Sequence, residues 1–181
     1  MLGKRFVFNN SGLIVLSLLI CLIAYFVERN ESVALLTLFG FSFATYTLLI
    51  RNRESLRIRE MIGWGLVMRI LLIGSIPALS DDYFRFIWDG MLTSHGFSPY
   101  LSIPVDFRGL NNAFSESLVE QMNSPEYHSV YPPVMQIIFA ACYSFGGDNI
   151  LNNILFLRVF ILLAEFGTFY CMIHIFKKVK K

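Results

Sequence analysis

The chain has 181 residues, of which 55% are hydrophobic and only 15% are charged, and its net charge is +2. Soluble domains carry about 25% charged residues, so this composition and a mean hydropathy of +0.58 exclude an ordinary soluble domain and predict an all-α integral membrane protein. The three cysteines lie inside apolar runs without metal-ligand spacing, which argues against a disulfide framework.

Two apolar runs near the N-terminus are expected to span the membrane. The first, residues 13–27, follows Lys4 and Arg5 and reaches about 20 residues with its neutral flanks, the length that a spanning helix needs. A cleaved signal peptide is the alternative, but no small-x-small cleavage site follows the run. Residues 33–50 form the second expected span.

An arginine-rich segment, residues 51–60, follows the second run. Its arginines predict a cytoplasmic loop by the positive-inside rule, in agreement with the basic N-terminus. A nucleic-acid patch is the alternative, but the shortness of a loop between two spans disfavours it, so no nucleic-acid partner is expected. Residues 61–79 are the third expected span, which makes residues 1–79 a domain of three transmembrane helices.

Residues 80–148 are then expected to form a long extracytoplasmic loop with juxtamembrane helices. Within this loop, residues 111–122 predict an amphipathic helix, and residues 134–145 are apolar but too short to span. Residues 149–181 hold a last span with a lysine-rich end, which the positive-inside rule places in the cytoplasm if 134–145 lies in the interface. The prediction is therefore about four transmembrane helices in the cytoplasmic (inner) membrane.

The most informative stretch is residues 81–90, Asp-Asp-Tyr-Phe-Arg-Phe-Ile-Trp-Asp-Gly. Its polar side chains share one face at helical spacing, because residues three or four positions apart are neighbours on a helix. This face holds Asp82, Arg85, Phe86 and Asp89. Asp81 also lies four residues before Arg85. The two interpretations are a catalytic carboxylate held at the membrane surface and an interfacial helix whose charges are only solvated.

The other face of the same stretch is apolar. Phe84, Ile87 and Trp88 are expected at the lipid headgroup boundary, where aromatic side chains are enriched. The stretch follows an apolar run directly, which agrees with a place at the membrane surface. Gly90 and then Gly96 and Pro99 are expected to break or end the helix.

Three motifs in order carry a family resemblance: residues 81–90, then Gly-Phe-Ser-Pro-Tyr at 96–100, then Tyr-Pro-Pro-Val-Met-Gln at 131–136. They resemble the N-terminal part of membrane glycosyltransferases with the GT-C fold, and most closely the bacterial polyprenol-phosphate-mannose-dependent mannosyltransferases. In that family the pattern reads roughly D-x-x-R-Y-x-W-D-G, then G-x-N-P-Y, then Y-P-P-x-x-Q. Phe86 replaces the usual Tyr here, and Ser98 stands where Asn is common.

The resemblance implies a glycosyltransferase that moves a hexose, mannose in this family, from a polyprenyl-phosphate carrier to an extracytoplasmic acceptor. Asp82 matches the family's catalytic aspartate, Asp81 is its near substitute, and Asp89 is the third catalytic candidate. The resemblance also implies a metal-independent reaction, because the carrier is a monophosphate, so neither a cofactor nor a metal is expected. A divalent cation bound by the aspartate oxygens is the alternative.

Sugar transfer explains the remaining candidates. A general base accepts the proton of the acceptor hydroxyl, and cations near the membrane surface stabilise the developing charge of the leaving phosphate. Arg85 is expected to hold the catalytic carboxylate ionised and oriented. Arg158 is expected to stabilise the phosphate, and the alternative is that it is an interfacial anchor. The alternative to substrate binding is a polar loop residue for His128, and an aromatic belt at the interface for Tyr100 and Tyr131. The substrate-binding candidates are Arg85, Trp88, Tyr100, His128, Tyr131, Gln136 and Arg158.

Two other functions are compatible with parts of the sequence. Members of this fold usually have more spans than are expected here, so the chain is expected either to be a fragment or to have a partner chain that supplies further helices. The other expected partners are the lipid bilayer and the lipid-linked sugar. A non-catalytic membrane subunit or truncated remnant is the first alternative function. A transporter piece, in which Arg69 and Glu165 would line a pathway, is the second, and the long external loop gives it no support.

Overall fold

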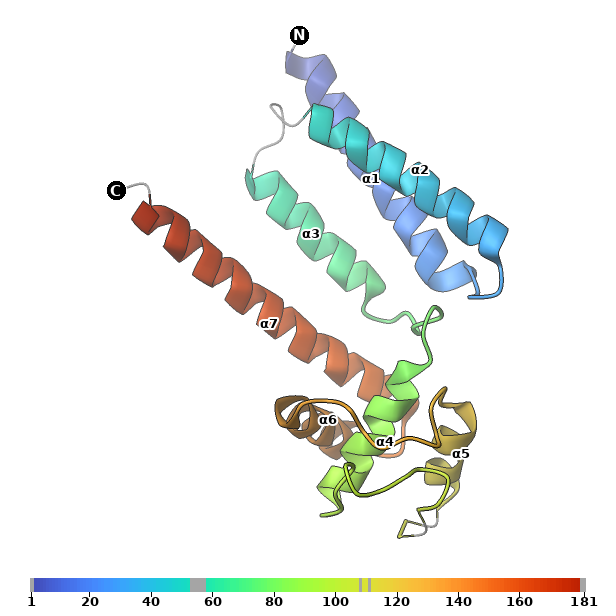
Figure 1. Ribbon diagram of the computed structural model, residues 1–181. Coiled ribbons are helices and arrows are strands. Elements are labelled where there is room, and N and C mark those ends of the chain that lie inside the picture. Colours follow the sequence, from blue (N-terminus) through green and yellow to red (C-terminus); the bar gives the residue numbers. More distant parts are fainter. Residues whose placement is uncertain (1, 53–57, 108, 111, 180–181) are drawn as a thin grey trace. The chain divides into compact units, whose positions relative to one another are not determined.

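The computed structural model describes residues 2–52, 58–107, 109–110 and 112–179, and these residues form seven helices and no strand (Figure 1). The all-α prediction is therefore confirmed for the described residues. The chain divides into two compact units, residues 1–80 and 81–181. Unit 1 holds α1 (Leu2–Phe26), α2 (Ser32–Arg51) and α3 (Ile58–Leu72), and unit 2 holds α4 (Asp82–Ser94), α5 (Ala113–Gln121), α6 (Pro133–Gly146) and α7 (Ile150–Val179).

In unit 1, α1 and α2 pack side by side, joined by a tight turn in which the backbone N–H of Glu31 donates to the carbonyl of Glu28 (Figure 1). Their close approach depends on Gly12, since a Cβ there would lie 2.8 Å from a methyl carbon of Leu49. α3 also packs against α1, and the Tyr25 hydroxyl donates to the carbonyl of Leu71 at 2.6 Å. Apolar side chains thus pack α1 against α2, and a hydrogen bond joins α1 to the last turn of α3.

Two of the described helices are long and apolar enough to cross a membrane, α2 and α7, with mean hydropathy 2.0 and 1.9. The apolar part of α1 is shorter, Asn10–Phe26. The third expected span differs more, because α3 ends at Leu72 and not at residue 79. Pro77 explains the early end, since proline lacks an N–H and disfavours a helical residue before it. Two expected spans therefore pass the length test, and the arrangement of four stays a prediction.

Residues 53–57 of the arginine-rich loop lie outside the described residues, so the prediction for this loop is not tested. The described part shows that α2 ends with Arg51 in its last turn. A cation at this end interacts favourably with the helix dipole.

Unit 2 is built around α4, which packs against α5, α6 and α7 (Figure 1). The apolar face of α4 forms the core of this unit: Phe84, Ile87 and Trp88 are only 5%, 2% and 0% exposed, and they pack with Leu118 and Met122. Their expected place at the lipid headgroup boundary is wrong. Burial against protein removes each of these side chains from water, which contributes about 1.5–3 kcal/mol apiece.

Gly90 lies inside α4 and does not end it, contrary to the prediction. A Cβ at this position would lie 2.3 Å from the carbonyl oxygen of Phe139, so glycine allows the backbones of α4 and α6 to touch. The helix ends at Ser94, and Gly96 follows with φ +81°, a left-handed conformation that glycine adopts without strain. The prediction that Gly96 ends the helix is confirmed.

The other helices of unit 2 begin where the sequence predicts, with recognisable caps. Asn112 precedes α5 and its Oδ1 accepts from the backbone N–H of Ser115 at 2.7 Å. α6 has Pro133 in its first turn, where a missing N–H costs nothing. Asn149 caps α7 in the same way, accepting from the N–H of Asn152 at 3.0 Å. The expected helices at 111–122 and 134–145 and the helix of the expected last span within 149–181 are all present.

Candidate functional site

The predicted polar face of α4 exists, but its residues differ sharply in exposure. Asp82 lies in the first turn and is half-buried, whereas Arg85 and Asp89 are only 4% and 0% exposed. The helix thus carries one carboxylate that solvent can reach and a second that it cannot. Asp81 is the N-cap residue, and its carbonyl accepts from the N–H of Phe84 at 3.2 Å.

Arg85 makes its hydrogen bonds inside unit 2. Its Nε donates to Asp89 Oδ1 at 2.8 Å, and its Nη1 donates to the carbonyls of Ser124 and Tyr127 at 3.1 and 2.9 Å. The guanidinium also lies 5.4 Å from the ring centroid of Trp88. Arg85 therefore fixes the segment 124–127 against α4, and the carboxylate that it orients by hydrogen bonding is Asp89.

Asp89 accepts hydrogen bonds at both of its carboxylate oxygens. Besides Arg85, the Ser129 hydroxyl and Gln136 Nε2 both donate to its Oδ2, the latter at 2.9 Å. Gln136 Nε2 also lies 2.7 Å from the Ser129 hydroxyl. We call Arg85, Asp89, Ser129 and Gln136 the buried polar cluster. A buried ion pair with this geometry is destabilising to break. Asp89 and Gln136 thus join α4, α6 and the segment between α5 and α6, and their predicted roles stay predictions.

The cluster retains some unused hydrogen-bonding capacity. In the part of the chain that the structure describes, Arg85 Nη2, Gln136 Oε1 and Trp88 Nε1 are buried atoms without a hydrogen-bond partner. Trp88 itself is wholly buried, with its ring edge-on to Phe107 at 6.0 Å. This is the position of a core side chain, and the predicted substrate-binding role of Trp88 stays a prediction.

Asp82 is held by a residue that the sequence gave no reason to select. Its Oδ1 accepts from Asn123 Nδ2 at 2.9 Å, and Asn123 Oδ1 in turn accepts from the Ser124 hydroxyl at 3.2 Å. Asn123 lies 41 residues away, directly after the C-cap of α5. No local pattern could have identified it, because the contact arises only when α5 packs on α4.

Tyr131 lies beside the polar face. Its ring packs edge-on against Phe86 and Phe139, at centroid distances of 5.0 and 5.6 Å. Burial raises the pKa of the Tyr131 hydroxyl, the negative charges of Asp82 and Asp89 raise it further, and Arg85 opposes them. The phenol is therefore a neutral group in the field of the α4 carboxylates at neutral pH.

The three sequence motifs come together in unit 2. The Tyr100 hydroxyl donates to the carbonyl of Tyr131 at 2.6 Å, and the N–H of Ser129 donates to the carbonyl of Pro99 at 3.3 Å. Gln136 in turn bonds to Asp89 of the first motif. The third motif is therefore hydrogen-bonded to both of the others, although the three lie far apart in sequence.

The remaining predicted residues lie outside this network or at its margin. His128 is exposed in the segment after α5, and Arg158 is half-buried on α7, which packs against α4 and α6. Among the residues described, no three His, Cys, Asp or Glu side chains are grouped so as to hold a metal ion. The roles of His128 and Arg158 and the absence of a metal stay predictions.

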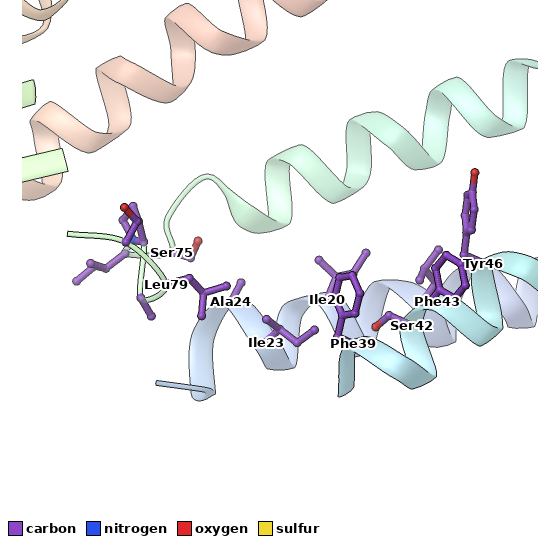
Figure 2. Close-up of a pocket in the computed structure, with 14 residues that line it drawn as sticks. Ile20, Ile23, Ala24, Phe39, Ser42, Phe43, Tyr46, Ser75 and Leu79 are labelled. Carbon is purple, nitrogen blue, oxygen red and sulfur yellow. The ribbon is translucent and has the colours of Figure 1, made fainter. Parts of the chain in front are cut away.

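Unit 1 contains a separate apolar groove of about 620 Å³, lined by side chains from α1, α2 and residues 75–80 (Figure 2). The hydroxyls of Ser42 and Ser75 in its wall donate to the carbonyls of Leu38 and Leu72, at 2.8 and 3.0 Å, inside their own segments. None of the predicted catalytic or substrate-binding residues lines it. The groove offers hydrocarbon surface and no titratable group other than Tyr46.

A protein-family model described as alpha-(1→6)-mannopyranosyltransferase, N-terminal domain, matches residues 10–181 and so includes all three motifs. No curated protein and no solved structure matches the chain. The predicted likeness to mannosyltransferases is therefore confirmed, and with the two apolar helices it supports a membrane-associated glycosyltransferase. The chain belongs to the family of the alpha-(1→6)-mannopyranosyltransferase N-terminal domain.

Proposed function

We propose that this chain is the N-terminal catalytic part of a mannosyltransferase that uses a polyprenyl-phosphate-linked mannose as donor and an extracytoplasmic hydroxyl as acceptor. Family membership supports mannosyl transfer in general. The lipid-linked donor follows from the likeness of the three motifs and from apolar helices that suit an enzyme acting at a membrane. The chain would cross the cytoplasmic membrane several times, with residues 80–148 on the outer side.

Asp82 is the general base in this proposal. The observation that carries it is the contrast on α4, where Asp82 is reachable from solvent while Asp89 is 0% exposed and bonded through both oxygens. In the transfer step the acceptor oxygen attacks the anomeric carbon and its proton passes to Asp82. The bond between that carbon and the phosphate oxygen breaks, and the electron pair leaves with the polyprenyl phosphate.

The other predicted residues take supporting roles. Arg158 would stabilise the leaving phosphate, since a preorganised cation is most effective where negative charge develops. Tyr100 and Tyr131 are joined by a hydrogen bond, His128 is exposed three residues before Tyr131, and the three would contact the sugar or the acceptor. Asp81 would be the nearest substitute for the base. The reaction would need no metal.

The test is transfer of radiolabelled mannose from polyprenyl-phosphate mannose in membranes that carry the chain together with any further helices encoded with it. Asp82→Asn is expected to reduce transfer by about 10²–10⁴-fold, the usual contribution of a general base. Asp106→Asn is the matched control, because Asp106 is an exposed carboxylate in the same loop. Undiminished transfer by Asp82→Asn at equal membrane levels would remove Asp82 as the base. A wild type without any transfer would favour a non-catalytic subunit.

A further inference from the structure

We propose that Asn123 is the positioning residue of Asp82, and that Ser124 orients the Asn123 amide for this task. The inference rests on the proposed function, in which Asp82 is the base. It adds two residues that belong to none of the three motifs.

Two consecutive hydrogen bonds lead from Ser124 through Asn123 to Asp82. The Ser124 hydroxyl donates to Asn123 Oδ1 at 3.2 Å, which turns the opposite, donor end of the amide toward α4. Asn123 Nδ2 then donates to Asp82 Oδ1 at 2.9 Å. An amide has one acceptor and one donor end, and an ionised carboxylate only accepts, so the carboxylate requires the donor end. The serine hydroxyl, which can donate, bonds the acceptor end and so restrains the amide in this orientation.

The segment that makes these bonds, residues 123–124, is anchored on both sides. On one side, Met122 is 5% exposed and packs in the core of unit 2, and its N–H donates to the carbonyl of Leu118 at 3.0 Å. On the other side, the Ser124 carbonyl accepts from Arg85 Nη1 at 3.1 Å. Arg85 is itself fixed by Asp89. Asn123 is therefore held between the core and the buried polar cluster, although its own side chain is exposed.

Through this segment the buried polar cluster would help to position the base. A base is effective only when its carboxylate is held in the productive geometry, and a displacement of about 1 Å can cost about 100-fold in rate. The Asp82 side chain lies in the first turn of α4, and the bond from Asn123 restrains the plane of its carboxylate. Asp89 and Arg85 thus act on the reaction through the backbone of Ser124 and the side chain of Asn123.

A purely structural alternative exists, in which Asn123 is a polar residue of an exposed loop. It predicts that removing the Asn123 amide leaves the surroundings of Asp82 unchanged. The two accounts differ in the reactivity of the Asp82 carboxylate, which can be measured whether or not the sample transfers sugar.

The experiment compares the rate at which a water-soluble carbodiimide labels Asp82 at one fixed pH, read by peptide mass spectrometry on the chain in membranes. Asn123→Ala, Asn123→Asp and Ser124→Ala are compared with wild type. Gln121→Ala is the control, because the Gln121 amide donates within α5, to the Ser117 carbonyl at 2.9 Å. Asp89, which is 0% exposed, reports in the same sample whether unit 2 is folded, since it is labelled only after unfolding.

We expect Asp82 to be labelled about 2- to 10-fold faster in both Asn123 variants, the factor that one hydrogen bond of this kind controls. Ser124→Ala should raise the rate less, and Gln121→Ala should leave it unchanged. An unchanged Asp82 rate in the Asn123 variants, with Asp89 still protected, would overturn the proposal. If Asp89 is labelled in those variants, Ser124→Ala decides in their place, and an unchanged Asp82 rate there has the same meaning.

The transfer assay separates this inference from the proposed function. Asn123→Ala should lower kcat about 10-fold at unchanged KM, because the amide orients the base and binds no substrate. If Asp82→Asn abolishes transfer while the Asn123 variants keep the wild-type kcat, the positioning role alone fails. If labelling responds to Asn123 but transfer does not depend on Asp82, the contact is real and the proposed function fails.

Discussion

The two units of this chain differ in how their polar side chains are satisfied. In unit 1 the hydroxyls of Ser17, Ser42 and Thr45 donate to carbonyls four residues earlier in their own helices, and the Tyr25 hydroxyl donates to the Leu71 carbonyl. In unit 2, Arg85 and Asp89 of α4 bond to each other and also to residues 39–47 positions away. A helix in hydrocarbon has no water to hydrogen-bond with, so its polar groups must be satisfied within the protein. Unit 2 also uses polar contacts between elements, and the proposed base, Asp82, is held by one of them.

The largest test of this contrast is removal of the buried carboxylate. Asp89→Ala should reduce the free energy of unfolding of unit 2 by about 3–5 kcal/mol, because it leaves Arg85 charged and unpaired in the interior. Protease susceptibility of the 95–130 region in membranes would measure the loss. Protection equal to wild type would mean that the cluster contributes little to the stability of unit 2.

A second test compares two glycines. Gly90→Ala should destabilise unit 2 by about 1–3 kcal/mol through overpacking, since its Cβ would meet the Phe139 carbonyl at 2.3 Å. Gly40→Ala in α2 is the control, because a Cβ there meets nothing within 4 Å. It should be neutral or stabilising by about 0.5–1 kcal/mol, the helix preference of alanine. Thermal unfolding in detergent would show both effects, and equal shifts would contradict the close approach of α4 and α6.

A third test uses two serines that are each 8% exposed. Ser129→Ala should cost about 1 kcal/mol, because Asp89 loses one of its donors in a buried site. Ser42→Ala should change stability by less than about 0.5 kcal/mol, because its hydroxyl only makes a second bond to a carbonyl of its own helix. The same unfolding assay applies, and a reversed order would break the comparison between the units.

The smallest expected effect concerns pH. The pKa of Tyr131 is raised in the folded chain, first by burial and then by Asp82 and Asp89, so folding favours its neutral form. The stability that this contributes is fully present below the ordinary value of 10.0 and is lost as pH rises through the raised folded value. Tyr131→Phe should therefore unfold less readily than wild type under alkaline conditions and equally at neutral pH. An identical alkaline profile would contradict this role.

The sequence predicts the helices of unit 2 well, but not what covers them. Helical spacing alone places Asp82, Arg85 and Asp89 on one face, because the period of the helix is fixed. The same spacing says nothing about which neighbour covers Trp88, so its burial in the core was missed. Asn123 was missed for a related reason, since its partner lies 41 residues away.

The early end of α3 is a different kind of error, because a signal was present. Pro77, three residues after Gly74, disfavours a helix through residue 79, but the apolar run masked it. The Gly90 error has the opposite origin: glycine weakens an isolated helix, and this signal was followed, yet a close approach of α6 makes glycine the residue that fits. At Gly90, packing against α6 outweighs the low helix propensity of glycine. At Pro77, the helix-breaking effect of proline outweighs the apolar run that suggested a longer helix.

The bond between Asp89 and Gln136 also bears on the order in which the chain folds. The two residues are 47 positions apart, and synthesis at about 5–20 residues per second separates their appearance by about 2–9 s. During that interval the carboxylate of α4 has to remain hydrated, so the core around Trp88 cannot close. Completion of unit 2 is therefore a late, non-local event, which is slow by its topology. A newly made α4 is exposed to chaperones and to other nascent chains until α6 arrives.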